Sequence, residues 1–186
     1  QVHAGHGTAL INDGKVLVIG NFLNEVFDPS TDTWSPAGNT IRERLMGFTT
    51  TVWNDGTVFI TGGMYQSAAN WYGPVSQSIA GVETYDPSAG IWTANESLLV
   101  SKQFHSGVKL DDNTFLVFGG VEMESYDRGT GLWTEAGSLL NERMEMFTAT
   151  QLSDGKILIV GGKKEVDDRI QGVKSVEIYD PSSASN

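Results

Sequence analysis

The chain has 186 residues, enough for one ordinary domain, and its 39% of hydrophobic residues can form a folded core. Its 12 Lys and Arg against 23 Asp and Glu give a formal charge of −11, which repels phosphate backbones, so we expect no nucleic-acid partner. The absence of cysteine excludes disulfides, thiol nucleophiles and thiolate metal sites, and no apolar run reaches the roughly 18 residues of a membrane span.

Four sets of marks recur in a fixed order along the chain. A tight turn lies at Asp13-Gly14, Asp55-Gly56, Asp112-Asn113 and Asp154-Gly155. A glycine-containing pair follows each turn, at Gly20-Asn21, Gly62-Gly63, Gly119-Gly120 and Gly161-Gly162. Next comes an aromatic residue before aspartate, at Phe27-Asp28, Tyr85-Asp86, Tyr126-Asp127 and Tyr179-Asp180. A tryptophan follows the first three of these, at Trp34, Trp92 and Trp133, so the chain is built from repeats.

Each repeat predicts four short strands, which we call a to d. Strand a runs into the Asp-Gly turn, at 8–11, 48–53, 105–110 and 147–152. Strand b is almost wholly apolar, at 16–19, 58–60, 115–118 and 157–160, which is typical of a strand covered on both faces. Strand c alternates, as at 82–85 and 176–179, and strand d carries the tryptophan. No stretch has helical periodicity, so we expect an all-β protein.

Four-stranded units that are apolar on both faces favour a β-propeller with blades at about 1–42, 43–99, 100–141 and 142–186. The run of strand a, Asp-Gly, apolar strand and Gly-Gly, then Glu-x-x-Asp with an aromatic residue before Asp, then Trp, resembles the kelch repeat. The resemblance covers essentially the whole chain and implies antiparallel blades around an axis. Kelch propellers include interaction scaffolds, lyase-like and epimerase enzymes and copper oxidases, so the resemblance leaves the function open.

The repeats also form pairs, since one repeat with a short b–c connection and one with a long b–c connection together span 99 residues, which makes Arg44 equivalent to Arg143. The fourth tryptophan is due at position 186, which is Asn186, so we expect the last blade to lack its outer strand. We therefore expect a partial propeller, either a piece of a six- to eight-bladed ring or half of an assembly that another chain completes. A self-closed ring of four blades is the alternative.

The a–b and c–d turns are tight, so a binding site is expected on the side of the b–c and d–a connections. The b–c connection of the second repeat contains Tyr65, Trp71 and Tyr72, which offer aromatic area to a sugar ring or a protein partner. Packing of the same rings onto their own blade is the alternative. Asp168 and Arg169 in the fourth repeat are further candidates, although this segment also reads as a solvated charged loop or, with Glu165 and Asp167, as a calcium site.

Arg44 and Arg143 enter strand a of alternate repeats, where each either pairs with a repeated glutamate or belongs to an anion-binding site at the channel mouth. The glutamates lie three residues before each turn aspartate, at Glu25, Glu83, Glu124 and Glu177, which indicates a structural role. The strands resemble those of galactose-oxidase-like propellers, but the copper site of that family needs a cysteine-crosslinked tyrosine. We expect no cofactor, no resident metal and no catalytic residues.

The leading prediction is a non-catalytic scaffold that binds a protein or an extracellular polymer through its b–c and d–a connections. One alternative is a carbohydrate-binding or carbohydrate-active propeller, and another is a structural subunit that assembles through open blade edges. The absence of cysteine and a sequon at Asn95 are compatible with secretion, with the cytoplasm as the alternative.

Overall fold

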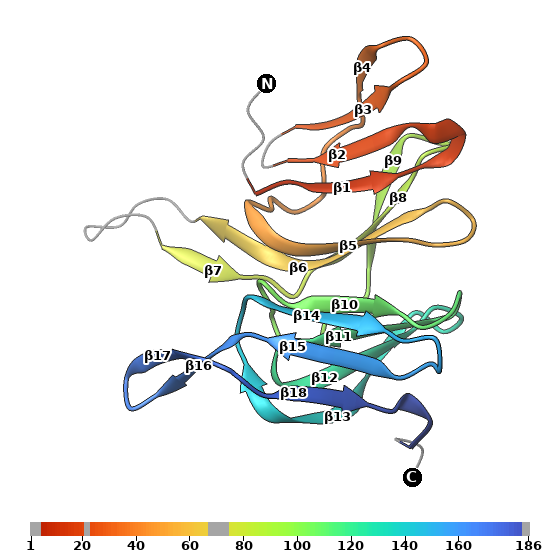
Figure 1. The fold of residues 1–186 in the computed structure, drawn as a ribbon. Helices are drawn as coiled ribbons and strands as arrows, with labels where there is room; N and C mark the ends of the chain where they lie inside the picture. Colours follow the sequence, from red (N-terminus) through yellow and green to blue (C-terminus); the bar gives the residue numbers. More distant parts are fainter. Residues whose placement is uncertain (1–4, 21–22, 67–74, 184–186) are drawn as a thin grey trace. The chain divides into compact units, whose positions relative to one another are not determined.

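The computed structural model describes residues 5–20, 23–66 and 75–183, which fold as two compact units, Gln1–Gln103 and Phe104–Asn186. Nearly all regular structure in these ranges is β-strand, in antiparallel sheets, so the prediction of an all-β protein is confirmed (Figure 1). The exceptions are two single turns of 3₁₀ helix, η1 (Asn12–Gly14) and η2 (Pro181–Ser183). Within the described ranges, no helix is long and apolar enough to cross a membrane.

The first sheet of unit 1 is a four-stranded antiparallel meander. Its strands, in sheet order, are β1 (Gly7–Leu10), β2 (Val16–Ile19), β3 (Asn24–Asp28) and β4 (Thr33–Pro36). The turn between β1 and β2 holds Asp13 at φ 61° and Gly14 at φ 71°. Glycine and aspartate tolerate this left-handed region better than most residues, so the Asp-Gly pair fixes a tight connection here.

The second sheet of unit 1 repeats the same order and adds a projecting hairpin. Its four main strands are β5 (Met46–Val52), β6 (Val58–Gln66), β8 (Val82–Asp86) and β9 (Ile91–Asn95). β6 continues six residues past its expected end at residue 60, and its last part pairs with β7 (Ser76–Ser78). The long b–c connection therefore begins and ends as an antiparallel ribbon, which Figure 1 shows extending from the sheet.

Facing apolar side chains join the two sheets of unit 1. Ala9, Leu17 and Ile19 of the first sheet form one buried cluster with side chains of the second sheet, including Val58 and Ile60. β-Branched and leucine side chains on alternate strand positions supply this contact, as expected when sheets stack face to face.

Unit 2 contains one complete meander, one three-stranded sheet and a separate hairpin. The meander comprises β10 (Ser106–Lys109), β11 (Thr114–Phe118), β12 (Gly120–Asp127) and β13 (Leu132–Arg143). The second sheet comprises β14 (Phe147–Gln151), β15 (Ile157–Gly161) and β18 (Val176–Tyr179), and the hairpin comprises β16 (Lys163–Val166) and β17 (Arg169–Gly172). The core again lies between the sheets, where Leu116 and Phe118 of β11 cluster with Ile157 and Ile159 of β15.

Two of the repeated sequence features recur with the same local structure: the aromatic–tryptophan pair and the turn aspartate. In the three complete meanders, the tryptophan of strand d pairs with the aromatic residue of strand c, with ring centroids 5.0 Å apart and rings tilted by 39–41°; the pairs are Phe27–Trp34, Tyr85–Trp92 and Tyr126–Trp133. The turn aspartates accept hydrogen bonds from a following Ser or Thr in all four repeats; these aspartates are Asp28, Asp86, Asp127 and Asp180. The aspartates hold the c–d turns tight, which leaves the b–c and d–a connections as the variable ones.

Candidate binding surface

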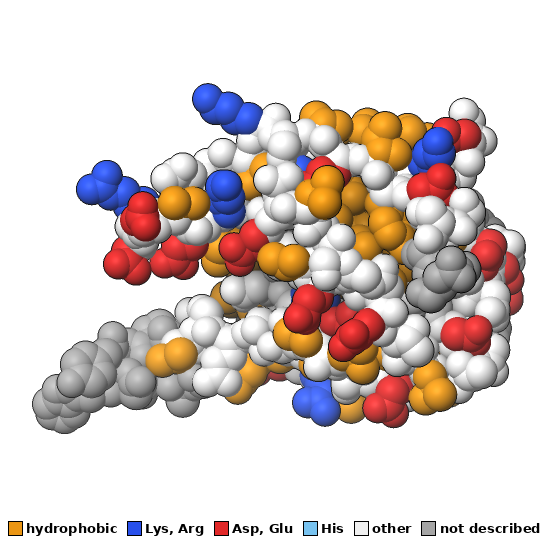
Figure 2. Space-filling view, turned by 90° about the horizontal axis from the view of Figure 1, so that it is seen from below, with side chains coloured by type: hydrophobic (Ala, Val, Ile, Leu, Met, Phe, Trp, Pro, Cys, Tyr) orange, Lys and Arg blue, Asp and Glu red, His pale blue; other side chains and the backbone are white. Residues whose placement is uncertain are grey.

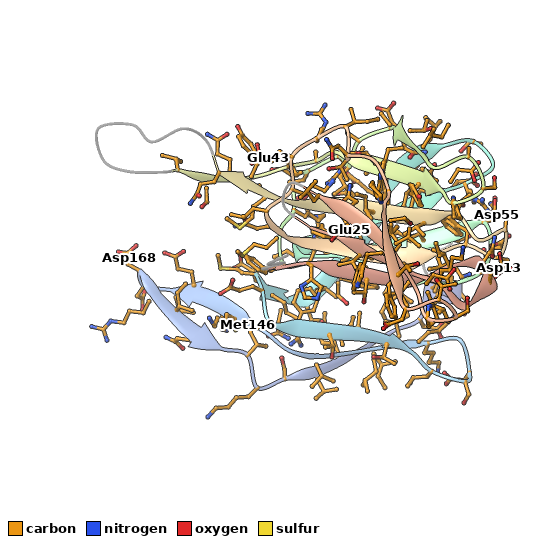
Figure 3. All side chains as sticks on the ribbon, turned by 90° about the horizontal axis from the view of Figure 1, so that it is seen from above. Asp13, Glu25, Glu43, Asp55, Met146 and Asp168 are labelled. Carbon is orange, nitrogen blue, oxygen red and sulfur yellow. The ribbon has the colours of Figure 1, made fainter. Side chains whose placement is uncertain are left out.

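In unit 1, the variable connections lie at the opposite end of the sheets from the Asp-Gly turns. Asp13 and Asp55 mark the turn end in Figure 3, and Glu43, in the connection from β4 to β5, lies toward the other end. In unit 2, Asp168 marks the tip of the β16–β17 hairpin in the same view. Candidate binding residues must therefore be sought around the two hairpins and the d–a connections beside them.

The hairpin of unit 1 presents one of the three predicted aromatic residues. Tyr65 of β6 lies opposite Gln77 of β7, and its hydroxyl donates a hydrogen bond of 2.7 Å to the Gln77 side-chain oxygen. The ring is half-buried, so it has both a packed and an accessible side. The other two predicted residues, Trp71 and Tyr72, lie outside the described residues.

The hairpin of unit 2 ends in a two-residue turn made by Asp167 and Asp168. Their φ angles of 51° and 57° lie in the left-handed region at both central positions, which gives the backbone twist that suits a two-residue hairpin. Asp168 and its neighbour Arg169 are exposed. In the part of the chain that the structure describes, no three His, Asp or Glu side chains form a group that could hold a metal ion.

Arg44 lies inside unit 1, in an ion pair with one of the repeated glutamates. Its Nη2 is 2.8 Å from Glu83 Oε1, the two side chains are 0% and 1% exposed, and Nη1 donates to the carbonyl of Gly62. Glu83 also accepts the backbone N–H groups of Ile41 and Arg42, at 2.6 and 3.1 Å. Burial lowers the pKa of Arg44, and the nearby Glu83 carboxylate opposes this effect. The pair ties the connection before β5 to strand β8.

Arg143 repeats this arrangement in unit 2, 99 positions later. Its Nη2 is 2.8 Å from Glu177 Oε1, and Nη1 donates to the carbonyl of Gly161. Glu177 accepts the backbone N–H of Leu140 at 2.7 Å and a side-chain N–H of Asn141 at 3.1 Å. Burial raises the pKa of Glu177, but these hydrogen bonds and the Arg143 charge outweigh it, so the pKa lies below its ordinary value. Both arginines thus pair with repeated glutamates and hold d–a connections in place.

Exposed apolar side chains lie in the b–c and d–a connections and in the strand residues next to them. In unit 2 these side chains are 38–90% exposed and form what we call the loop surface, which consists of Val121, Leu140, Met144, Met146 and Ile170. In unit 1 the corresponding connections expose Leu23, Ile41, Leu99 and Val100. Hydrophobic side chains also reach the surface between acidic and basic ones on the face that Figure 2 shows.

Backbone pairing brings the segments of the loop surface together. Gly120, next to Val121, pairs with Arg143, and the N–H of Met144 donates to the carbonyl of Lys163 at 2.7 Å. Lys163 begins the β16–β17 hairpin, which carries Ile170. No sequence motif pointed to these residues; apolar side chains in the connections and at the adjoining strand ends were the available signal.

A pocket of about 260 Å³ lies beside the hairpin of unit 1, lined by Arg42, Glu43, Tyr65 and Ile79. Arg42 and Glu43 are exposed, Tyr65 is half-buried and Ile79 is buried. The pocket thus combines apolar walls with one positive and one negative charge. Of these residues, sequence reasoning identified only Tyr65.

No protein-family model matches the chain, and no curated protein sequence matches it. The chemistry available to the surface therefore follows from its own side chains. These offer burial of apolar area and charge-assisted hydrogen bonds, both of which occur in protein–protein interfaces.

Proposed function

We propose that the chain forms blades of a kelch-type β-propeller and acts as a non-catalytic scaffold that binds a protein partner through its b–c and d–a connections. Three features support the propeller assignment: successive antiparallel meanders, the same aromatic–tryptophan pair in three sheets, and apolar cores between neighbouring sheets within each unit. In this assignment the sheet β14-β15-β18 is the blade of which the described residues supply three strands.

The loop surface is the observation that carries the binding proposal. Leu140 is 90% exposed and Met146 is 71% exposed, although Glu177 and Arg143 hold the end of β13, which contains Leu140, next to the connection that contains Met146. Grouped exposed apolar side chains are costly in water and mark interaction sites, and methionine adapts its shape to a partner surface. A backbone that is already fixed loses little conformational entropy on binding, so this surface is prepared for a partner.

Selection of peptides from a phage-displayed library against the whole chain tests this proposal. We expect selected peptides to lose at least about tenfold in affinity when Leu140 and Met146 are both changed to serine, because their anchoring area is removed. Leu132→Ser is the matched control, since Leu132 is 56% exposed at the c–d turn of the same unit. Peptides that tolerate the double change but are lost with the control would overturn the proposal.

A second candidate function, assembly through an open sheet, is favoured by strand β18. In the described residues β18 pairs only with β15, and its side chains Val176 and Ile178 are 57% and 61% exposed. Unpaired strand edges with apolar faces favour pairing with another chain. Sedimentation of the chain and of a Val176→Lys, Ile178→Lys variant separates the two candidates. If the unchanged chain sediments as an oligomer and the variant as a monomer, assembly through β18 is supported. If both proteins sediment as monomers, it is excluded.

A further inference from the structure

We propose that the pocket lined by Arg42, Glu43, Tyr65 and Ile79 is the anchor site for one neutral aromatic side chain of a protein partner. This inference rests on the proposed protein-binding function and adds the chemistry of the residue that is recognised. It is carried by a comparison inside the chain, because unit 2 repeats the backbone around the pocket with different side chains.

The two units share the backbone hydrogen bonds around the pocket. In each unit, one bond joins the d–a connection to strand b or its hairpin continuation, and another joins the end of the b–c connection to the glycine pair. In unit 1 these bonds run from Leu45 to Met64 at 2.7 Å and from Ile79 to Gly63 at 2.8 Å; in unit 2 they run from Met144 to Lys163 at 2.7 Å and from Val173 to Gly162 at 2.8 Å.

The side chains on this shared backbone differ between the units. Positions 42 and 65 of unit 1 hold Arg and Tyr, whereas the equivalent positions 141 and 164 of unit 2 hold Asn and Lys. The same backbone therefore forms without the aromatic ring and without the guanidinium. Repeated residues are explained by folding, but Arg42 and Tyr65 depart from the repeat at accessible positions, which points to recognition.

The lining of the pocket fits a flat, apolar group. Its walls are the Tyr65 ring, the Ile79 side chain and the aliphatic stem of Arg42, and its volume of about 260 Å³ is below the roughly 300–1,000 Å³ typical of sites for larger ligands. An aromatic side chain gains from stacking on Tyr65 and from the Arg42 guanidinium near its face. One side chain, rather than an extended ligand, suits this volume.

The charges of the pocket favour a neutral anchor in a peptide. The charges of Arg42 and Glu43 sum to zero, so a charged anchor of either sign meets one like charge in the pocket. A neutral peptide group can instead form a hydrogen bond with each of the two side chains. Its carbonyl oxygen accepts from the Arg42 guanidinium, and its N–H donates to the Glu43 carboxylate. A sugar ring, in contrast, needs several polar groups directed at its hydroxyls, and the Tyr65 and Ile79 walls present a largely apolar surface.

Titration of the isotope-labelled whole chain, followed by amide NMR signals, tests the inference with defined probes. The probes are N-acetyltryptophanamide, N-acetyltyrosinamide, N-acetylleucinamide and a methyl glucoside. We expect saturable shifts at residues 42–43, 65 and 79 with the two aromatic amides, and at least about tenfold weaker binding of the other two probes. Equal or tighter binding of the leucine amide or the glucoside overturns the inference, as do shifts located elsewhere.

Two variants complete the test. Arg42→Asn with Tyr65→Lys installs the side chains of unit 2, which that unit accommodates on the same backbone, and we expect it to abolish aromatic binding. Tyr65→Phe keeps the ring and removes only the bond to Gln77, so we expect binding within about threefold of the unchanged chain. Unchanged affinity in the double variant contradicts the inference.

The loop-surface variant separates failure of this inference from failure of the proposed function. Leu140→Ser with Met146→Ser leaves the pocket residues unaltered, so aromatic amides should bind it normally. If the pocket binds the amides but selected peptides ignore the loop surface, the proposed function fails and pocket recognition stands. If the peptides need the loop surface but the amides do not bind, only the pocket inference fails.

Discussion

The buried arginines show how single residues act through the connections that they hold. Arg143 brings a positive charge into the interior of unit 2, where Glu177 and two carbonyl groups surround it. Glu177 in turn accepts a hydrogen bond from the Leu140 backbone N–H, and this holds Leu140 where its own side chain is 90% exposed. Loss of the ion pair should therefore affect both stability and the loop surface.

We predict that Arg143→Met lowers the free energy of unfolding by about 3–5 kcal/mol, because Glu177 keeps a buried charge without its partner. Adding Glu177→Gln removes that charge and keeps an oxygen that accepts the Leu140 N–H, so the double variant should be more stable than Arg143→Met alone. Urea unfolding of the three proteins measures both effects. A double variant less stable than the single one contradicts the prediction.

The repeated carboxylates predict acid sensitivity. Hydrogen bonds from the following Ser or Thr hold the pKa values of Asp28, Asp86, Asp127 and Asp180 below the ordinary value, and Glu177 is also shifted down. Groups with a lower pKa in the folded chain stabilise it above the unfolded pKa. The stability that they contribute is lost as pH falls through the folded value.

The urea midpoint should therefore decrease as the pH is lowered from about 5 to 3. Ser88→Ala, which removes the hydroxyl donor to Asp86, should make this decrease shallower, whereas Ser78→Ala, outside the aspartate turns, should not. Two results would contradict this prediction: a urea midpoint that stays constant between about pH 5 and 3, or a pH dependence of the midpoint that Ser88→Ala leaves unchanged.

At the scale of strands, the three aromatic–tryptophan pairs share one geometry but not one environment. The Trp34 ring is 54% exposed, whereas Trp133 is 6% exposed and also meets Phe115 edge to face. We predict that Trp133→Ala costs about 3–5 kcal/mol of unfolding free energy, because it leaves a cavity. Trp34→Ala should cost clearly less, since water already covers half of that ring. Chemical denaturation of both variants measures the difference, and equal losses would contradict the prediction.

The sequence predicted strands best where pattern and turn chemistry agreed. β2 and β18 have their expected bounds, because an apolar or alternating run ends at a turn signal on at least one side. β6 exceeds its expected length because it pairs with Ser-Gln-Ser of β7, a polar segment without strand periodicity. The repeat spacing led us to consider an ion pair between Arg44 and a repeated glutamate. The pocket, in contrast, depends on Arg42 and Ile79 lying beside Tyr65 in space, and the spacing of these residues in the sequence did not indicate that.

At the scale of the whole molecule, the charge of −11 should raise the association rate of positively charged partners. We predict that a peptide with one aromatic residue flanked by lysines associates more slowly as salt is raised from about 0.05 to 0.5 M, because screening weakens long-range attraction. Its dissociation rate should change much less. Surface plasmon resonance measures both rates, with a peptide flanked by serines as control. An equal salt effect on the two peptides contradicts the prediction.

The placement of the two buried ion pairs also bears on how such a chain can be recombined. Arg44 and Glu83 belong to residues 1–103, and Arg143 and Glu177 belong to residues 104–186. A chimera joined after Gln103 inherits each of these two arginines together with its glutamate, whereas a crossover between Arg143 and Glu177 pairs Arg143 with whatever residue the other parent has in place of Glu177. Recombination between related genes should therefore yield folded proteins more often when a segment that encodes two sheets is exchanged than when a segment that encodes one sheet is exchanged.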